Sequence, residues 1–384
     1  MDDLTSARAI IAGAINCNTS PNAYYEGRSD RISRNLKDCL DKVITSKDLY
    51  NNLIPKRRRN NDNEVNFLLI NDNSNVDRIG DLPDDVLLHL LSFVDMKSAG
   101  RTSLVSKRWR YVWTYLLDLD FEHPDFHLIH RPKTVCRPSY NYQLNRYCKW
   151  VNQVMTGNRA SYLTTFRIHF PLYGSYTTNI DKWIAMALSK NVSNLELNLS
   201  TQNGHPIMLK NSYVIRQDFL SNNNALKTIH LEALVVEGDV VEYVLSNCLN
   251  LDRLTVKNCE FYLCGSVGIF PKTQVVVSSY KLKHFELSGC NNIKSIQISA
   301  PNLTCFKFLG IKQEVQYHSV SALVNVTFED RYWYHNRKLN VFSKFSTQLE
   351  QLSLSWSLEV SWSLNYFNYN YVSISITYVL INVS

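Results

Sequence analysis

The sequence predicts an α/β protein in which a small three-helix module precedes an irregular solenoid with a curved parallel sheet. Two observations predict this order. Between residues 77 and 120, apolar side chains recur every three or four positions, the period of a helix with one buried face. From residue 121 to 355, short units of the form apolar-x-x-apolar-x-apolar recur along the chain. With 384 residues, 45% of them hydrophobic and 20% charged, the chain has globular composition and enough length for a sizeable core.

Residues 1–76 are predicted to form a weakly ordered extension. They are poor in aromatic residues and end in an Asn/Asp-rich stretch at 60–75, whose side chains compete with the backbone for hydrogen bonds. We expect one helix near Leu36–Leu49. A basic run follows Pro55 and is a candidate nuclear-import signal, a phosphate-contacting patch or a solvated charge run: Lys56, Arg57, Arg58 and Arg59.

The module at residues 77–120 is predicted to contain three short helices. The first has Pro83 at its start and an apolar stripe with helical spacing, made of Leu82, Val86, Leu87, Leu90, Leu91 and Val94. A second helical stretch is expected around Ala99–Val105, and Ser106 is placed to cap a third that carries Trp109. Three such helices cannot hide all their large apolar side chains from water, so the surplus predicts a binding partner.

The units of residues 121–355 begin mostly 20 to 32 positions apart, near the period of leucine-rich repeats, with closer spacing between 282 and 303. Each is expected to add one strand to the sheet and to point its apolar residues into a shared core, as in Leu251/Leu254/Val256, Leu282/Phe285/Leu287 and Ile293/Ile296/Ile298. Intervening positions would line the concave face, for example Asp252, Arg253 and Thr255, or Lys283, His284 and Glu286. Residues 181–188 have helical spacing and would cover the other side, with Trp183 in the core. Residues 356–384 are expected to be an atypical cap or tail.

Two blocks of this sequence, residues 77–94 and 97–113, resemble the plant-type F-box, with Leu82-Pro83 before a leucine-rich helix and then Thr102-Ser-Leu-Val-Ser-Lys-Arg-Trp109. The remainder resembles the leucine-rich region of plant F-box/LRR proteins. The resemblance implies a non-catalytic subunit that binds a Skp adaptor, and through it a cullin-RING ligase, while the repeats hold an unknown protein substrate. The adaptor-contacting positions it implies are Leu82, Pro83, Val86, Leu87, Leu90, Leu91, Leu104, Val105 and Trp109. Two departures are Gly100 inside the expected second helix and the lack of a recognisable FBD-type domain after the repeats.

Other classes of function find little support in the sequence. No nucleophile elbow, P-loop or zinc-binding pattern occurs, so neither an enzyme nor a cofactor or metal site is expected. The basic run lacks a recognition helix or stacking aromatic residues beside it, which disfavours a nucleic-acid partner. The remaining alternative is a leucine-rich interaction scaffold that takes no part in a ubiquitin ligase.

The expected location is intracellular, in the nucleus, the cytoplasm or both. Nine cysteines are scattered without a C-x-x-C pair, which fits reduced thiols. No apolar run approaches the roughly 20 residues that span a bilayer, and no secretory signal is apparent.

Overall fold

The computed structural model describes residues 82–104, 107–122, 140–201, 212–217, 223–265, 268–272, 274–290, 292–309, 314–330, 348–360 and 370–379. The chain divides into two compact units, one of residues 1–120 with 156–160 and the other of residues 121–155 with 161–384. The expectations for residues 1–76, including the helix near Leu36–Leu49 and the run Lys56–Arg59, lie outside the described residues.

The first unit contains the predicted short helices. They are α3 (Asp84–Leu91), α4 (Met96–Arg101) with the 3-10 turn η3 (Thr102–Leu104), and α5 (Trp109–Val112) with the 3-10 turn η4 (Trp113–Tyr115). The second helix begins at Met96, earlier than expected, because the Asp95 side chain accepts a hydrogen bond from the Ser98 amide at 2.8 Å and caps it there. The expected cap at Ser106 lies outside the described residues.

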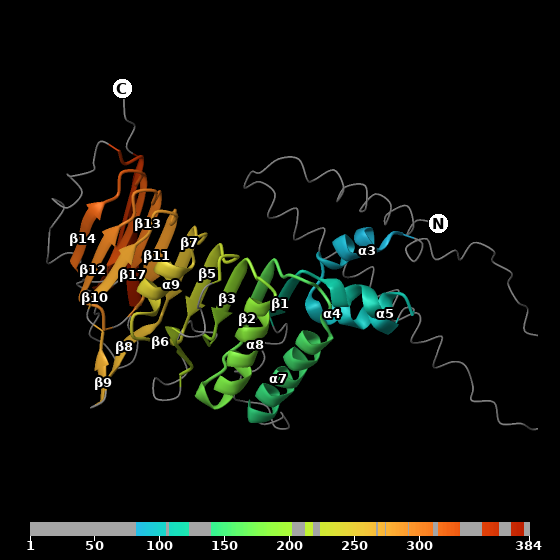
Figure 1. The fold of residues 1–384 in the computed structure, drawn as a ribbon. Helices are drawn as coiled ribbons and strands as arrows, with labels where there is room; N and C mark the ends of the chain where they lie inside the picture. Colours follow the sequence, from blue (N-terminus) through green and yellow to red (C-terminus); the bar gives the residue numbers. More distant parts are fainter. Residues whose placement is uncertain are drawn as a thin grey trace, which may run out of the picture. The chain divides into compact units, whose positions relative to one another are not determined.

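The second unit is built on a ten-stranded sheet whose strands follow the order β1-β2-β3-β5-β7-β11-β13-β15-β16-β17. Figure 1 shows β2, β3, β5, β7, β11 and β13 following one another across this sheet. The strands are β1 (Asp118–Glu122), β2 (Thr165–His169), β3 (Asn194–Asn198), β5 (Thr228–Glu232), β7 (Arg253–Lys257), β11 (His284–Ser288), β13 (Cys305–Leu309), β15 (Asn325–Asp330), β16 (Gln351–Val360) and β17 (Asn370–Val379). Pairings from β2 to β16 are parallel, and β17 pairs with β16 antiparallel. The prediction of a parallel sheet is confirmed, and the sheet continues into residues 356–384 through the antiparallel strand β17.

The core of this sheet is made by the predicted apolar positions. Because the strands pair in register, equivalent side chains stack in two buried rows. One row contains Phe166, Leu195, Ile229, Leu254, Phe285, Phe306 and Val326, and the other contains Ile168, Leu197, Leu231, Val256, Leu287 and Phe308. Each such side chain contributes about 1.5–3 kcal/mol when fully buried. The repeat pattern therefore explains the fold through stacked, equivalent positions.

Helices cover part of the second unit. They are α7 (Tyr140–Gly157), the 3-10 turn η5 (Gly174–Tyr176), α8 (Thr177–Ser189) and α9 (Val240–Asn247). The helix expected at 181–188 is confirmed as part of α8, and Trp183 is fully buried, donating its indole N–H to Asn152 of α7 at 2.7 Å. The sequence pattern did not predict α7, in which Tyr147 stacks on Phe170 at 4.0 Å between ring centroids.

One repeat assignment is wrong. The unit Ile293/Ile296/Ile298 forms β12 (Ser295–Ser299), which lies outside the ten-stranded sheet and pairs with β10 (Gln274–Ser278) and β14 (Glu314–Ser319). A further sheet contains β4 (Val214–Ile215), β6 (Val235–Glu237), β8 (Glu260–Gly265) and β9 (Gly268–Pro271). The segment after β11 thus forms a strand of a separate three-stranded sheet, where a strand of the large sheet was expected. Strands of both sheets alternate between buried and more exposed residues, so the apolar spacing in the sequence could not show to which sheet a strand belongs.

Candidate functional site: a helical edge and a polar strand face

The residues expected to contact the adaptor differ in their exposure to solvent. Four of them are core residues of the first unit: Leu87, Leu90, Leu91 and Trp109 are 0 to 6% exposed. Pro83 is exposed, Leu82 and Val86 are half-buried, and Leu104 is 56% exposed. Val105 lies outside the described residues. The side chains available to a partner therefore lie at the entry to α3 and at the end of η3.

Arg108 ties the entry of α3 to the start of α5. Its Nε donates to Asp84 Oδ1 at 2.8 Å, and its guanidinium also donates to the Leu82 carbonyl oxygen. The two ends of this link are 24 and 26 residues away from Arg108 in the sequence. A forked donor that reaches both a carboxylate and a carbonyl orients the backbone it holds. Sequence reasoning missed this role because Arg108 gave no local signal beyond its place in the Lys-Arg-Trp block.

The third helical segment also presents exposed aromatic residues. Tyr111 and Tyr115, one helical turn apart, are 49% and 45% exposed. The guanidinium carbon of Arg159 lies 5.3 Å from the centre of the Tyr111 ring, within cation-π range. These residues broaden the surface of the first unit that is open to a partner.

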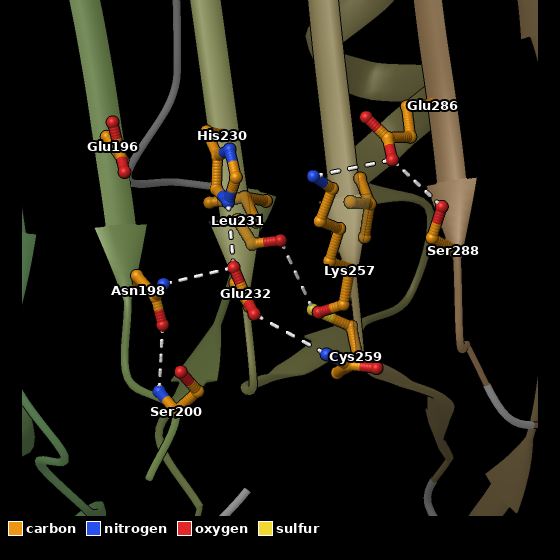
Figure 2. Close-up of polar contacts among 12 residues, drawn as sticks. Glu196, Asn198, Ser200, His230, Leu231, Glu232, Lys257, Cys259, Glu286 and Ser288 are labelled. Carbon is orange, nitrogen blue, oxygen red and sulfur yellow. Dashed lines mark hydrogen bonds and ion pairs between the residues drawn. The ribbon is translucent and has the colours of Figure 1, made fainter. Parts of the chain in front are cut away.

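In the second unit, the side chains between the buried rows form a polar face, which we define by the alternate residues of β2, β3, β5, β7, β11 and β13, such as Glu196, His230 and Glu286 (Figure 2). Glu232 is the centre of its first half. Its Oε2 accepts hydrogen bonds from Asn198 at 3.0 Å and from His230 at 3.2 Å, and its Oε1 accepts one from Asn258 at 3.4 Å. Burial acts to raise the pKa of Glu232, but these donors and the positive Lys257 outweigh it and hold the pKa below the ordinary value.

The second half of the polar face is centred on Glu286. Its Oε1 lies 3.4 Å from Nζ of Lys257 and 3.4 Å from Nζ of Lys307, and it also accepts a hydrogen bond from Ser288 at 3.0 Å. Figure 2 shows Lys257 reaching from its strand toward Glu286. Of the positions expected to line this face, Arg253 is exposed, whereas Thr255 is only 8% exposed between longer neighbours.

Behind the polar face, two thiols occupy equivalent positions of successive repeats. Cys259 donates to the Leu231 carbonyl at 3.7 Å, and Cys290 donates to the Val256 carbonyl at 3.5 Å. Burial raises the pKa of Cys290 to about 12 and that of Cys259 well above its ordinary value. Such thiols are inert structural donors that satisfy carbonyls at the strand ends.

Metal sites and membrane spans each require a recognisable arrangement of residues. In the described parts of the chain, no group of three His, Cys, Asp or Glu side chains is arranged to hold a metal ion. Among the helices given above, none has both the length and the apolar character needed to cross a bilayer.

Two domain families match the chain. Residues 79–119 match the F-box domain, and residues 207–378 match the LRR domain described as At1g61320/AtMIF1. The chain is 27% identical over 263 residues to the putative F-box/LRR-repeat protein At3g18150 of Arabidopsis thaliana, covering 65% of this chain and 51% of that protein. It is 26% identical over 312 residues to the F-box/LRR-repeat protein At3g26922 of the same plant, covering 77% and 95%. The match spans about half the length of several relatives, At3g18150 among them.

A helical unit that matches the F-box, followed by stacked strands that match a leucine-rich-repeat domain, defines an F-box/LRR architecture. The expected resemblance to plant F-box/LRR-repeat proteins is thus confirmed by two domain matches and by relatives of that name.

Proposed function

We propose that this protein is the substrate-recruiting F-box subunit of a Skp-cullin-F-box ubiquitin ligase. The observation that carries the proposal is an F-box unit in which two apolar residues stay exposed: Pro83 at a helix entry that Arg108 holds, and Leu104 at the end of η3. In proteins of this family the F-box generally binds a Skp adaptor and the repeats bind a protein target. The subunit would contribute binding and positioning, while the chemistry of ubiquitin transfer takes place on other subunits.

The proposed adaptor surface consists of the exposed and half-buried members of the expected set, together with Val105: Leu82, Pro83, Val86, Leu104 and Val105. Leu87, Leu90, Leu91 and Trp109 would act from beneath, because their burial fixes the positions of the helices that present this surface. We assign the F-box to residues 77–120, the repeats to 121–355 and a cap to 356–384.

The test is binding of the full chain to a plant Skp adaptor, compared with a Leu82→Ala/Pro83→Ala variant. Losing about 1.5–3 kcal/mol of apolar contact predicts roughly ten-fold to hundred-fold weaker binding. A matched control is Leu249→Ala/Tyr280→Ala, which removes two residues of the second unit that are 60% and 78% exposed. If a well-folded wild type fails to bind, the leucine-rich interaction scaffold becomes the better account.

We assign the site of action to the nucleus or the cytoplasm. The run Lys56, Arg57, Arg58 and Arg59 supports nuclear entry through its resemblance to basic import signals. Changing all four to alanine in a fluorescent fusion of the full chain should shift its signal from nucleus to cytoplasm. An unchanged distribution would leave the run as a solvated charge cluster.

A further inference from the structure

We infer that the second half of the polar face binds an acidic, carboxylate-rich segment of the substrate protein. This inference deepens the proposed function, since it names the chemical class of the segment that the repeats would hold. The surface, here called the basic half, is defined by Arg253, Lys257, Lys283, His284 and Lys307.

The strands place these side chains on one continuous surface. In the pairing register, Arg253 of β7 lies beside His284 of β11, and Glu286 of β11 lies beside Lys307 of β13. Adjacent strands are about 4.8 Å apart, and alternate residues of a strand point to the same face. Side chains from three neighbouring strands therefore converge on one patch. Lys283 is exposed directly before β11, and its charge acts on His284 of that strand.

Positive charge exceeds negative charge within the basic half. Lys257 and Lys307 share the single carboxylate of Glu286, with each ammonium nitrogen 3.4 Å away. Arg253 is exposed and has no ion pair with any residue that the structure describes. Two further acidic groups lie nearby: Asp252, directly before β7, and Glu232 of β5, which is beside Lys257 in the pairing register. Three carboxylates thus face the four permanent cations Arg253, Lys257, Lys283 and Lys307, and the excess positive charge is available to an external anion.

The electrostatic field at His284 agrees with this excess of positive charge. Burial lowers the pKa of His284, and the charges of Arg253 and Lys283 lower it further, against an opposing effect of Asp252. The surface thus disfavours an added proton.

The first half of the polar face has the opposite balance. Arg167 lies 3.0 Å from Glu196 and 4.0 Å from Glu122, so one cation serves two carboxylates. Glu232 has His230 as its close ion-pair partner. An acidic segment would therefore be drawn to β7, β11 and β13 and repelled from β2, β3 and β5, which gives it a preferred position along the repeats.

The spread of the cations favours an extended chain over a single anion. Arg253 and Lys257 are four residues apart on one strand, about 13 Å at the ordinary rise of a strand. Lys307 lies two strands away from them. Several carboxylates along an extended peptide match this spacing, whereas one compact anion would reach only part of it.

The experiment measures binding of a fluorescein-labelled ten-residue peptide of alternating Glu and Ser to the full chain. The test variant is Arg253→Gln/Lys283→Gln/Lys307→Gln. The matched control is Lys149→Gln/Lys182→Gln/Lys294→Gln, which removes three exposed lysines that lie off the polar face and gives the same net charge. We expect the test variant to bind at least about ten-fold more weakly and the control to change less than about two-fold. Raising NaCl from about 50 to 300 mM should weaken wild-type binding.

Three outcomes would overturn the inference: no binding of the acidic peptide by the wild type, equal loss in both triple variants, or tighter binding of a single-stranded oligonucleotide of equal charge. Should the test variant lose its circular dichroism signal, Arg253→Gln alone decides between binding and no binding at this surface, because that exposed side chain has no ion pair to disrupt among the described residues. Skp adaptor binding, measured on the same variants, should stay unchanged. Failure of adaptor binding in the wild type would therefore count against the proposed function and leave the peptide result to stand separately.

Discussion

Arg108 is the side chain that connects the two sequence blocks of the F-box, since it holds both the Leu82 carbonyl and the Asp84 carboxylate. If the proposed function is correct, Arg108→Ala should weaken Skp adaptor binding by about ten-fold, because the Leu82-Pro83 backbone would lose its fixed orientation. Stability should fall by less than about 1 kcal/mol, because Asp84 is 67% exposed and such pairs contribute little.

Arg108→Lys separates position from charge in the same assay. A lysine keeps the positive charge but lacks the planar fork that reaches two acceptors. The affinity of the Arg108→Lys variant for the Skp adaptor should therefore fall between those of the wild type and the alanine variant. Isothermal calorimetry measures the affinity and thermal unfolding measures the stability. Full affinity in Arg108→Ala would show that the entry to α3 holds its position without this link.

Glu232 predicts a pH dependence of stability. Its pKa in the folded protein lies below the ordinary glutamate value of about 4.3, so its contribution is present above that pH and is lost as the pH falls through the lowered folded value. Above about pH 5, Glu232→Gln should be less stable than the wild type by roughly 1.5–3 kcal/mol, the worth of hydrogen bonds to a charged group. Urea unfolding between pH 3 and pH 7 should show this difference shrinking in acid. A difference that grows in acid would contradict the assignment.

Residue roles were only partly predictable from the sequence. Leu87 and Pro83 belong to one motif, yet one is fully buried and the other exposed, and only the packing of α3 against its neighbours distinguishes them. The link from Arg108 to Asp84 depends on how the helices meet, which no local pattern encodes. On the polar face, the strand alternation placed Arg253 and Glu286 correctly, but the sharing of Glu286 by two lysines required the register.

Among the structural elements, the turn that leaves β11 needs a glycine. Gly289 has a φ of 65°, and a Cβ there would lie 2.3 Å from Oδ1 of Asn258. Gly289→Ala combines an unfavourable backbone conformation with a clash, so it should destabilise the second unit by about 1–3 kcal/mol. Thermal unfolding checks this, and an unchanged melting temperature would mean that Asn258 moves away at no cost.

The second helix offers a contrasting substitution. Gly100 lies inside α4, where an added Cβ would meet no atom within 4 Å. Gly100→Ala should therefore stabilise the first unit by up to about 1 kcal/mol, since glycine is the weaker helix former. Denaturant unfolding followed through a fluorescent label on this unit measures the gain, and a loss of stability would contradict the open space around Gly100.

The elements themselves were predictable where period and burial agree. Most strands of the large sheet and α8 follow from their apolar spacing, and the helices of the first unit follow from theirs, whereas β1 begins inside the segment expected to be helical. The second helix began early because the Asp95 cap acts before the first periodic residue. The unit at 293–298 was placed in the wrong sheet because an alternating strand looks the same in either one, and α7 was missed because its 18 residues mix polar and aromatic side chains.

At the scale of the whole molecule, the second unit is a stack in which each repeat rests on its neighbours. The buried rows and the thiol-to-carbonyl hydrogen bonds of Cys259 and Cys290 repeat from strand to strand, so the free energy of unfolding is expected to be shared between adjacent repeats. Because of the same stacking, each strand contributes only a few side chains to the polar face. The net charge of this face can therefore change sign from one group of strands to the next within one sheet.

The reactivity of the buried thiols can be used to follow the unfolding of this stack. Alkylating reagents attack the thiolate, and burial raises the pKa of both Cys148 and Cys290 to about 12, so these residues should resist iodoacetamide in the folded protein at pH 8. As urea is added, Cys259 and Cys290 should become reactive together, because they occupy adjacent repeats and each donates to a carbonyl of the preceding strand. Mass spectrometry of the alkylated peptides gives the midpoint for each residue. Cys148, on α7, is the reference from elsewhere in the unit, and its midpoint can differ. Separate midpoints for Cys259 and Cys290 would show that neighbouring repeats unfold independently, contrary to the coupling that their hydrogen bonds to preceding strands predict.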